Sequence, residues 1–163
     1  MKRSLLTYTA TILLIISFKS TTAQTGWGIG ASGLYNISNN YKGISARLLI
    51  PAKEDLWAVP YVFKYFDNSE FSFGLSGLKI FYRNRGVAFY VVASGSFRAN
   101  VSVSVNDSTA DGSQSYKAEG EAGLGLLLGG GCLKLFAEPR YSVLSEEYNA
   151  RLGLVYFFSC NSG

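Results

Sequence analysis

From residue 27 onward, apolar and polar side chains alternate along the chain in short runs that turn-forming residues separate. A period of two residues is typical of a half-buried β-strand, whereas a helix would repeat about every 3.6 residues. The runs are rich in Val, Tyr and Phe, which favour strands. We therefore predict eight strands, at Trp27–Tyr35, Gly43–Pro51, Leu56–Phe66, Phe71–Asn84, Val87–Val103, Tyr116–Gly129, Leu133–Leu144 and Asn149–Phe158.

Most of the predicted strands have one continuously apolar face. Phe89 and Phe97, for example, share a face opposite Ser96 and Arg98. A transmembrane barrel directs its apolar face to lipid and its polar face to the lumen, whereas a soluble barrel does the reverse. Aromatic residues near the strand ends and the many charges on the polar face favour the transmembrane form. The alternation therefore predicts an all-β fold, an eight-stranded antiparallel up-and-down transmembrane β-barrel.

The connections between the predicted strands differ in length on the two sides of the barrel. Asn36–Lys42 and Asn106–Ser115 are long, whereas Ala52–Asp55 and Arg85–Gly86 are short. Long loops on one side and tight turns on the other are typical of outer-membrane barrels. In the strand Phe71–Asn84 the alternation changes phase near Ser76 and Gly77, where we expect a β-bulge. Pro60 and Pro139 lack the N–H that a strand donates, so we expect bulges there as well.

The polar faces contain charges of both signs, and a narrow lumen would force these charges to pair because unpaired burial is costly. Lys64, Lys117 and Lys134 belong to this polar set. We predict that the lumen is filled by a charge network of Arg47, Lys79, Arg98, Glu119, Glu121, Glu138, Arg140 and Arg151. An eight-stranded barrel has no room for an open channel. An ion gate or a small binding site in the lumen is the alternative interpretation of these charges.

The first 23 residues have the three parts of a secretory signal peptide. Lys2 and Arg3 form a basic start, an apolar stretch follows, and small residues precede Gln24. The apolar run is shorter than the ~20 residues that a membrane-spanning helix needs, and Lys19 ends it. We therefore expect a signal peptide at 1–23 and one barrel domain at 24–163.

Charge and composition exclude several functions. The formal net charge is +4, but loss of Lys2, Arg3 and Lys19 would leave 12 basic against 11 acidic residues. A nucleic-acid partner therefore has no support. The chain has no His, which excludes Ser-His-Asp catalysis and His metal ligands. Glu119 and Glu121 share a face, but nothing completes an acid/base site. We expect no enzyme activity, no cofactor and no metal.

Two further features concern the ends of strands. Cys132 and Cys160 would lie at similar heights on the tight-turn side, and export permits oxidation, so a disulfide is possible although their facing parity differs. Asn106, Asp107 and Asp111 supply oxygen ligands in one long loop, but their spacing does not match a calcium loop. A solvated loop is the favoured interpretation.

The last predicted strand resembles the insertion signal of bacterial outer-membrane barrels. Gly153, Tyr156 and Phe158 occupy the motif's glycine and aromatic positions, although five residues follow Phe158 here. The stretch from Phe136 to Tyr141 resembles the Phe-x-Glu-x-Arg-Tyr segment of the same small barrels. The chain thus resembles the small eight-stranded family of OmpA, OmpX and OmpW type, and the Thr-Ala-Gln junction is reminiscent of Bacteroidetes secreted proteins.

This resemblance implies an integral protein of the bacterial outer membrane, in contact with membrane lipid and with the barrel-assembly machinery. A monomer is expected, and its loops could bind a surface ligand. The implied role is structural, adhesive or interactive at the cell surface. Two alternatives remain open: a narrow conduit for small apolar molecules, as in the OmpW type, and a secreted soluble barrel that binds a ligand.

Overall fold

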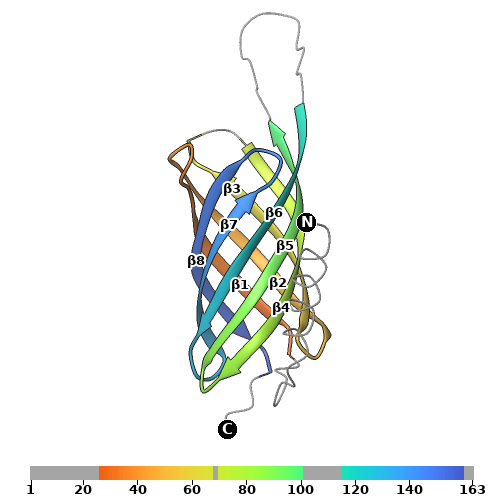
Figure 1. The fold of residues 1–163 in the computed structure, drawn as a ribbon, viewed down its shortest axis with the longest axis vertical. Helices are drawn as coiled ribbons and strands as arrows, with labels where there is room; N and C mark the ends of the chain where they lie inside the picture. The colour runs from red at the N-terminus through yellow and green to blue at the C-terminus, as the bar shows by residue number, and fades with distance from the viewer. Residues whose placement is uncertain (1–25, 68–69, 101–114, 160–163) are drawn as a thin grey trace, which may run out of the picture.

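The computed structural model describes residues 26–67, 70–100 and 115–159, and these residues form one closed antiparallel barrel (Figure 1). No helix in these ranges is long and apolar enough to cross a membrane. The strands are β1 (Gly28–Asn36), β2 (Tyr41–Lys53), β3 (Leu56–Tyr65), β4 (Glu70–Asn84), β5 (Val87–Asn100), β6 (Ser115–Leu128), β7 (Leu133–Ser142) and β8 (Glu147–Phe157).

Each strand pairs with its neighbours in sequence, and β1 closes the barrel against β8. Gly28 pairs with Phe157 and Asn36 with Asn149, so the described chain enters and leaves the barrel at one end. We name this the turn end, because the connections β2–β3, β4–β5 and β6–β7 also lie there, at the bottom of Figure 1. The opposite end is the loop end. The predicted up-and-down topology is confirmed.

Side chains of β1, β2 and β5 alternate between lumen and exterior as their sequence pattern predicts. On β2, Ser45, Arg47 and Leu49 are buried, whereas Ile44 is exposed. Strand β3 differs from the prediction, because its aromatic face fills the lumen and Lys64 lies outside. Gly and Ser residues on the inner faces of β1 and β2 leave space, and the large side chains of β3 occupy it.

The irregularities of the sheet are not at the predicted positions. Register shifts occur between Pro51 and Lys53 and between Ile80 and Tyr82. Strand β4 keeps its phase at Ser76 and Gly77, so the bulge expected there is wrong.

Pro60 and Pro139, where bulges were expected, also produce none. Cross-strand pairing is interrupted opposite Pro60 in β2–β3 and opposite Pro139 in β6–β7, while the register continues on both sides. Proline supplies no N–H to the ladder, and the loss of that one donor explains the interruption. The bulges expected at these prolines are therefore wrong.

The interior contains two apolar clusters. The larger one fills the half of the lumen nearer the turn end. It comprises Leu49, Trp57, Val59, Leu78, Ile80, Ala88, Tyr90, Val92, Leu127, Phe136, Val155 and Phe157, and we call it the apolar plug. The smaller cluster packs Leu34, Tyr61, Phe63 and Tyr65 nearer the loop end. Polar side chains occupy the remaining interior, and they form the candidate site.

Candidate functional site

The candidate site is a buried charge network in the lumen, and Glu138 on β7 is its centre. The Glu138 side chain is 1% exposed. Arg47 of β2 donates Nη1–H to Glu138 Oε1 at 2.5 Å, and Arg140 donates Nη2–H to Oε2 at 2.7 Å. The Tyr90 hydroxyl of β5 also donates to Oε1. One carboxylate therefore joins three strands through charge-assisted hydrogen bonds.

A second carboxylate, Glu121 on β6, extends the network toward the loop end. Arg151 Nη2 lies 2.7 Å from Glu121 Oε2, and Arg140 Nη1 lies 3.2 Å from the same oxygen. Asn149 donates to Glu121 Oε1 at 3.3 Å. Arg140 therefore bridges Glu121 and Glu138, and each guanidinium in this part of the lumen has an anionic partner.

A third group lies closest to the loop end. Arg98 Nη2 is 2.6 Å from Glu119 Oε2 and 3.5 Å from Glu147 Oε2. Asn36 also donates to Glu147 Oε2, at 2.8 Å. Sequence reasoning does not identify Glu147 and Asn36, because each lies at a strand end within a stretch whose pattern predicts a connection between strands.

Aromatic rings flank the guanidinium groups. The Arg47 guanidinium carbon lies 3.3 Å from the centre of the Phe136 ring. The corresponding carbon of Arg151 lies 4.9 Å from the Tyr61 ring centre. A cation over a ring face is attracted by the ring quadrupole, more strongly where water is excluded. Phe136 of β7 therefore stabilises Arg47, and Tyr61 on the inward aromatic face of β3 stabilises Arg151 from across the lumen.

The contact between Tyr90 and Glu138 depends on a glycine. Tyr90 pairs with Gly125, and a Cβ atom at position 125 would overlap the Tyr90 ring. The absence of that atom lets the ring cross β6 and place its hydroxyl on β7. Tyr90 and Gly125 were also missed, because the period-two pattern shows the face of a residue but not how far its side chain reaches.

The structure brings together seven of the eight residues proposed for the network and separates Lys79 from them. Lys79 pairs with Leu56 and Val91, whose exposed side chains share its outward face. Its assignment to the lumen is therefore wrong. The predicted phase change in β4 does not occur, and the continued alternation puts Lys79 outside. In the described residues the ion pairs of the lumen comprise four arginines and four glutamates, so their charges balance.

The charged side chains of the lumen pair with one another across strands. Glu119 forms an ion pair with Arg98, and Glu121 forms one with Arg140. Within the described residues, neither carboxylate faces an unpaired acidic side chain with which it could act as an acid/base pair. In the described ranges no cluster of three or more His, Cys, Asp or Glu side chains could hold a metal ion. The network ties β2, β5, β6, β7 and β8 together across the lumen.

The residues of the resemblance motif lie on both faces of β8 and one residue beyond its end. Gly153 faces inward, and a Cβ atom there would overlap the Ala31 carbonyl oxygen and crowd Ser32 of β1. Tyr156 and Phe158 point outward near the turn end, and Phe158 is 61% exposed. Gly153 therefore permits the close approach of the two strands that close the barrel.

Three predictions fall wholly or partly outside the described residues. They are the signal peptide at 1–23, the loop that contains Asn106, Asp107 and Asp111, and the Cys132–Cys160 disulfide, of which only Cys132 is described. Each stays a prediction.

Solved structures with similar folds are small barrels. The N-terminal β-barrel domain of Pseudomonas aeruginosa OprF matches with a TM-score of 0.65 and 17% identity, over 84% of this chain and 100% of that domain. A designed transmembrane β-barrel matches with a TM-score of 0.64 and 12% identity, over 85% and 99% of the two chains. The Yersinia pestis outer membrane protein Ail matches with a TM-score of 0.53 and 14% identity, over 83% and 100%. No family model and no curated protein matches the chain.

Proposed function

We propose that this chain is an integral protein of the bacterial outer membrane with a structural or surface-interaction role. The observation that carries the proposal is the reversal of a soluble protein's surface: a network of buried arginines and glutamates lies inside, and large apolar side chains cover most of the outside. Ile29, Leu75 and Leu154 are each about half exposed or more. Such a surface is unfavourable in water and favourable in lipid.

Aromatic residues on the outer surface support the same proposal. Trp27, Tyr82 and Tyr156 are exposed near the turn end, and Tyr35 and Tyr148 are exposed near the loop end. Aromatic rings near both ends of the barrel match the two membrane–water interfaces of a bilayer, where amphipathic rings are favoured. A secreted soluble barrel would need a charged exterior and an apolar cavity, whereas this barrel has a largely apolar exterior and a filled lumen that contains the charge network.

The filled lumen favours a structural role over transport. Trp57 and Phe157 pack edge to face within the apolar plug, with ring centres 5.2 Å apart. The charge network occupies the interior above the plug. A conduit for small apolar molecules would have to displace both. We therefore assign function to the external surface and the loops, and we propose a non-enzymatic role.

We also propose that the end of β8 engages the barrel-assembly machinery. Tyr156 and Phe158 project outward from the last strand, where an external partner can reach them. Replacement of Tyr156 by Ala is expected to reduce the amount of folded barrel in cells while refolding into detergent is retained. Tyr148→Ala, at the other end of β8, is the control. Equal effects of the two substitutions would contradict a specific signal.

The experiment for the proposed role is reconstitution of the full chain into dye-loaded phospholipid vesicles. Heat-dependent mobility on a gel reports the closed barrel, and dye release reports conduction. We expect a heat-modifiable barrel that releases no dye. Release by the wild-type barrel would contradict a filled lumen, and the absence of a heat-modifiable form would contradict a membrane barrel.

A further inference from the structure

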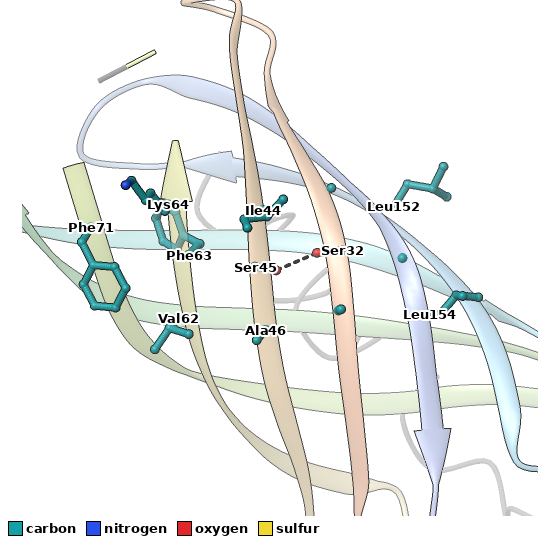
Figure 2. A pocket seen from close by; sticks show the side chains of 13 residues that line it. Ser32, Ile44, Ser45, Ala46, Val62, Phe63, Lys64, Phe71, Leu152 and Leu154 are labelled. Carbon is teal, nitrogen blue, oxygen red and sulfur yellow. Dashed lines mark hydrogen bonds between the residues drawn. The ribbon is translucent and has the colours of Figure 1, made fainter. Parts of the chain in front are cut away.

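The outer surface of the barrel has a groove over β1 and β2, shown in Figure 2. Two cross-strand rows form it. In the row nearer the loop end, Gly33 of β1 lies between Leu152 and Ile44. In the next row, Ala31 of β1 and Ala46 of β2 lie between Leu154 and Val62. Small residues therefore form a floor between larger apolar walls.

The serine side chains of the strands that form the floor of the groove lie on the inner side of the sheet. Ser32 and Ser45 point into the lumen and join their hydroxyls at 2.6 Å, so their polar atoms are satisfied away from the groove (Figure 2). The groove encloses about 750 Å³, within the range of roughly 300–1,000 Å³ of ligand sites. Its surface is almost wholly apolar, as the site of an acyl chain would be.

One charge marks the loop end of the groove. Of the described residues that line it, only Lys64 is charged. Lys64 pairs with Ile44 and Phe71 on the outer face, one position before β3 ends, and it is exposed. A lysine on the lipid face is costly at the bilayer centre but nearly free at the interface, where its ammonium reaches the headgroups.

A second, adjoining hollow lies on the other side of Leu152. It encloses about 570 Å³ and shares Gly33 and Leu152 with the first. Lys42 lines its loop end, as Lys64 does for the first groove. The Lys42 amide donates to the carboxylate of Asp67 at 2.7 Å, so an acidic group lies close to this second lysine. Lys64 is therefore the stronger candidate to contact an anion.

We propose that this face binds one anionic, phosphate-bearing lipid of the leaflet at the loop end, and phosphatidylglycerol is the probe for that chemistry. One acyl chain lies along the floor of Ala31, Gly33 and Ala46, and the headgroup phosphate contacts Lys64. The adjoining hollow provides space for the second chain. A basic side chain at a membrane interface attracts anionic headgroups. The inference rests on the proposed membrane location.

The test is native mass spectrometry of the full barrel released from detergent after incubation with phosphatidylglycerol or phosphatidylcholine. We expect one phosphatidylglycerol to be retained in preference to phosphatidylcholine. Lys64→Gln should lower phosphatidylglycerol retention roughly fivefold, the value of one basic residue near a membrane surface. Lys79→Gln removes the same charge from an outward position outside the groove, and it should have no effect.

Ala46→Phe fills the floor and should abolish retention of both lipids, whereas the outward control Val91→Phe should not.

Equal retention by wild type and Lys64→Gln would overturn the proposal, as would an equal loss in Lys79→Gln. A dimer that Ala46→Phe converts to monomer, without a change in lipid retention, would assign the groove to a second copy of the chain instead. Heat-modifiable mobility of each variant verifies folding. A wild-type protein that stays soluble without detergent would contradict the membrane location itself, and this outcome is distinct from a folded membrane barrel that retains no lipid.

Discussion

At the scale of single residues, the interior depends on complete pairing of charges. Glu138 contacts Arg47, Arg140 and Tyr90, and it is almost fully buried. Burial of an ion pair is costly in itself, and removal of one partner is costlier because it leaves a charge uncompensated. The network therefore fixes one arrangement of the strands around it.

Replacement of Glu138 by Gln keeps the size of the side chain and removes its charge. Arg47 and Arg140 then lose their shared anion, and we expect the free energy of unfolding to fall by about 3–5 kcal/mol. Denaturant unfolding in detergent micelles measures the change. Glu54→Gln, at an exposed position of the β2–β3 turn, is the control. A midpoint equal to that of wild type would show that Glu138 does not hold the network together.

Gly125 provides a second prediction at this scale. Gly125→Ala forces the Tyr90 ring to move, and overpacking of this kind costs about 1–3 kcal/mol. In a Tyr90→Ala background the same substitution should cost much less, because no ring remains to be displaced. Gly77→Ala is the matched control, since a Cβ atom there meets nothing within 4 Å. Additive effects of the two substitutions would contradict the proposed contact.

At the scale of the strands, sequence patterns predict the positions of the strands well. They predict less well which face of each strand is directed to the lumen. The eight strands and their order follow from period-two alternation and turn residues. The inward face of β3 does not, because Trp57, Tyr61 and Phe63 are as suitable for lipid as for a lumen with space to fill. The lumen position predicted for Lys64 assumes that the aromatic face of its strand points to lipid, and that of Lys79 assumes a phase change at Ser76 and Gly77. Cross-strand register places both lysines outside. Partners such as Tyr90 depend on distances across the barrel, which no local pattern contains.

The seam between β1 and β8 closes the barrel, and it provides the prediction at this scale. A Cβ atom at Gly153 would overlap a backbone oxygen of β1, which a rotamer change cannot relieve. Gly153→Ala should therefore lower the yield of heat-modifiable barrel on refolding and lower its unfolding midpoint. Gly77→Ala again serves as the control. A normal yield from Gly153→Ala would mean that the seam tolerates the added methyl group.

At the scale of the whole molecule, the account depends on the reversal between inside and outside. The arginine and glutamate charges cancel one another in the lumen, and the plug of Trp57, Tyr90 and Phe157 fills the turn-end half. The exterior consists largely of exposed Ile, Leu, Val and aromatic side chains. A barrel built in this way is stable in a bilayer and would aggregate in water.

Fractionation of cells that express the full chain tests this central claim most directly. Membranes are separated from the soluble periplasmic contents and then washed with alkaline carbonate, which removes peripheral proteins. We expect the chain to stay in the outer-membrane fraction after the wash and to leave it only with detergent. Recovery in the soluble periplasmic or secreted fraction without detergent would contradict the account.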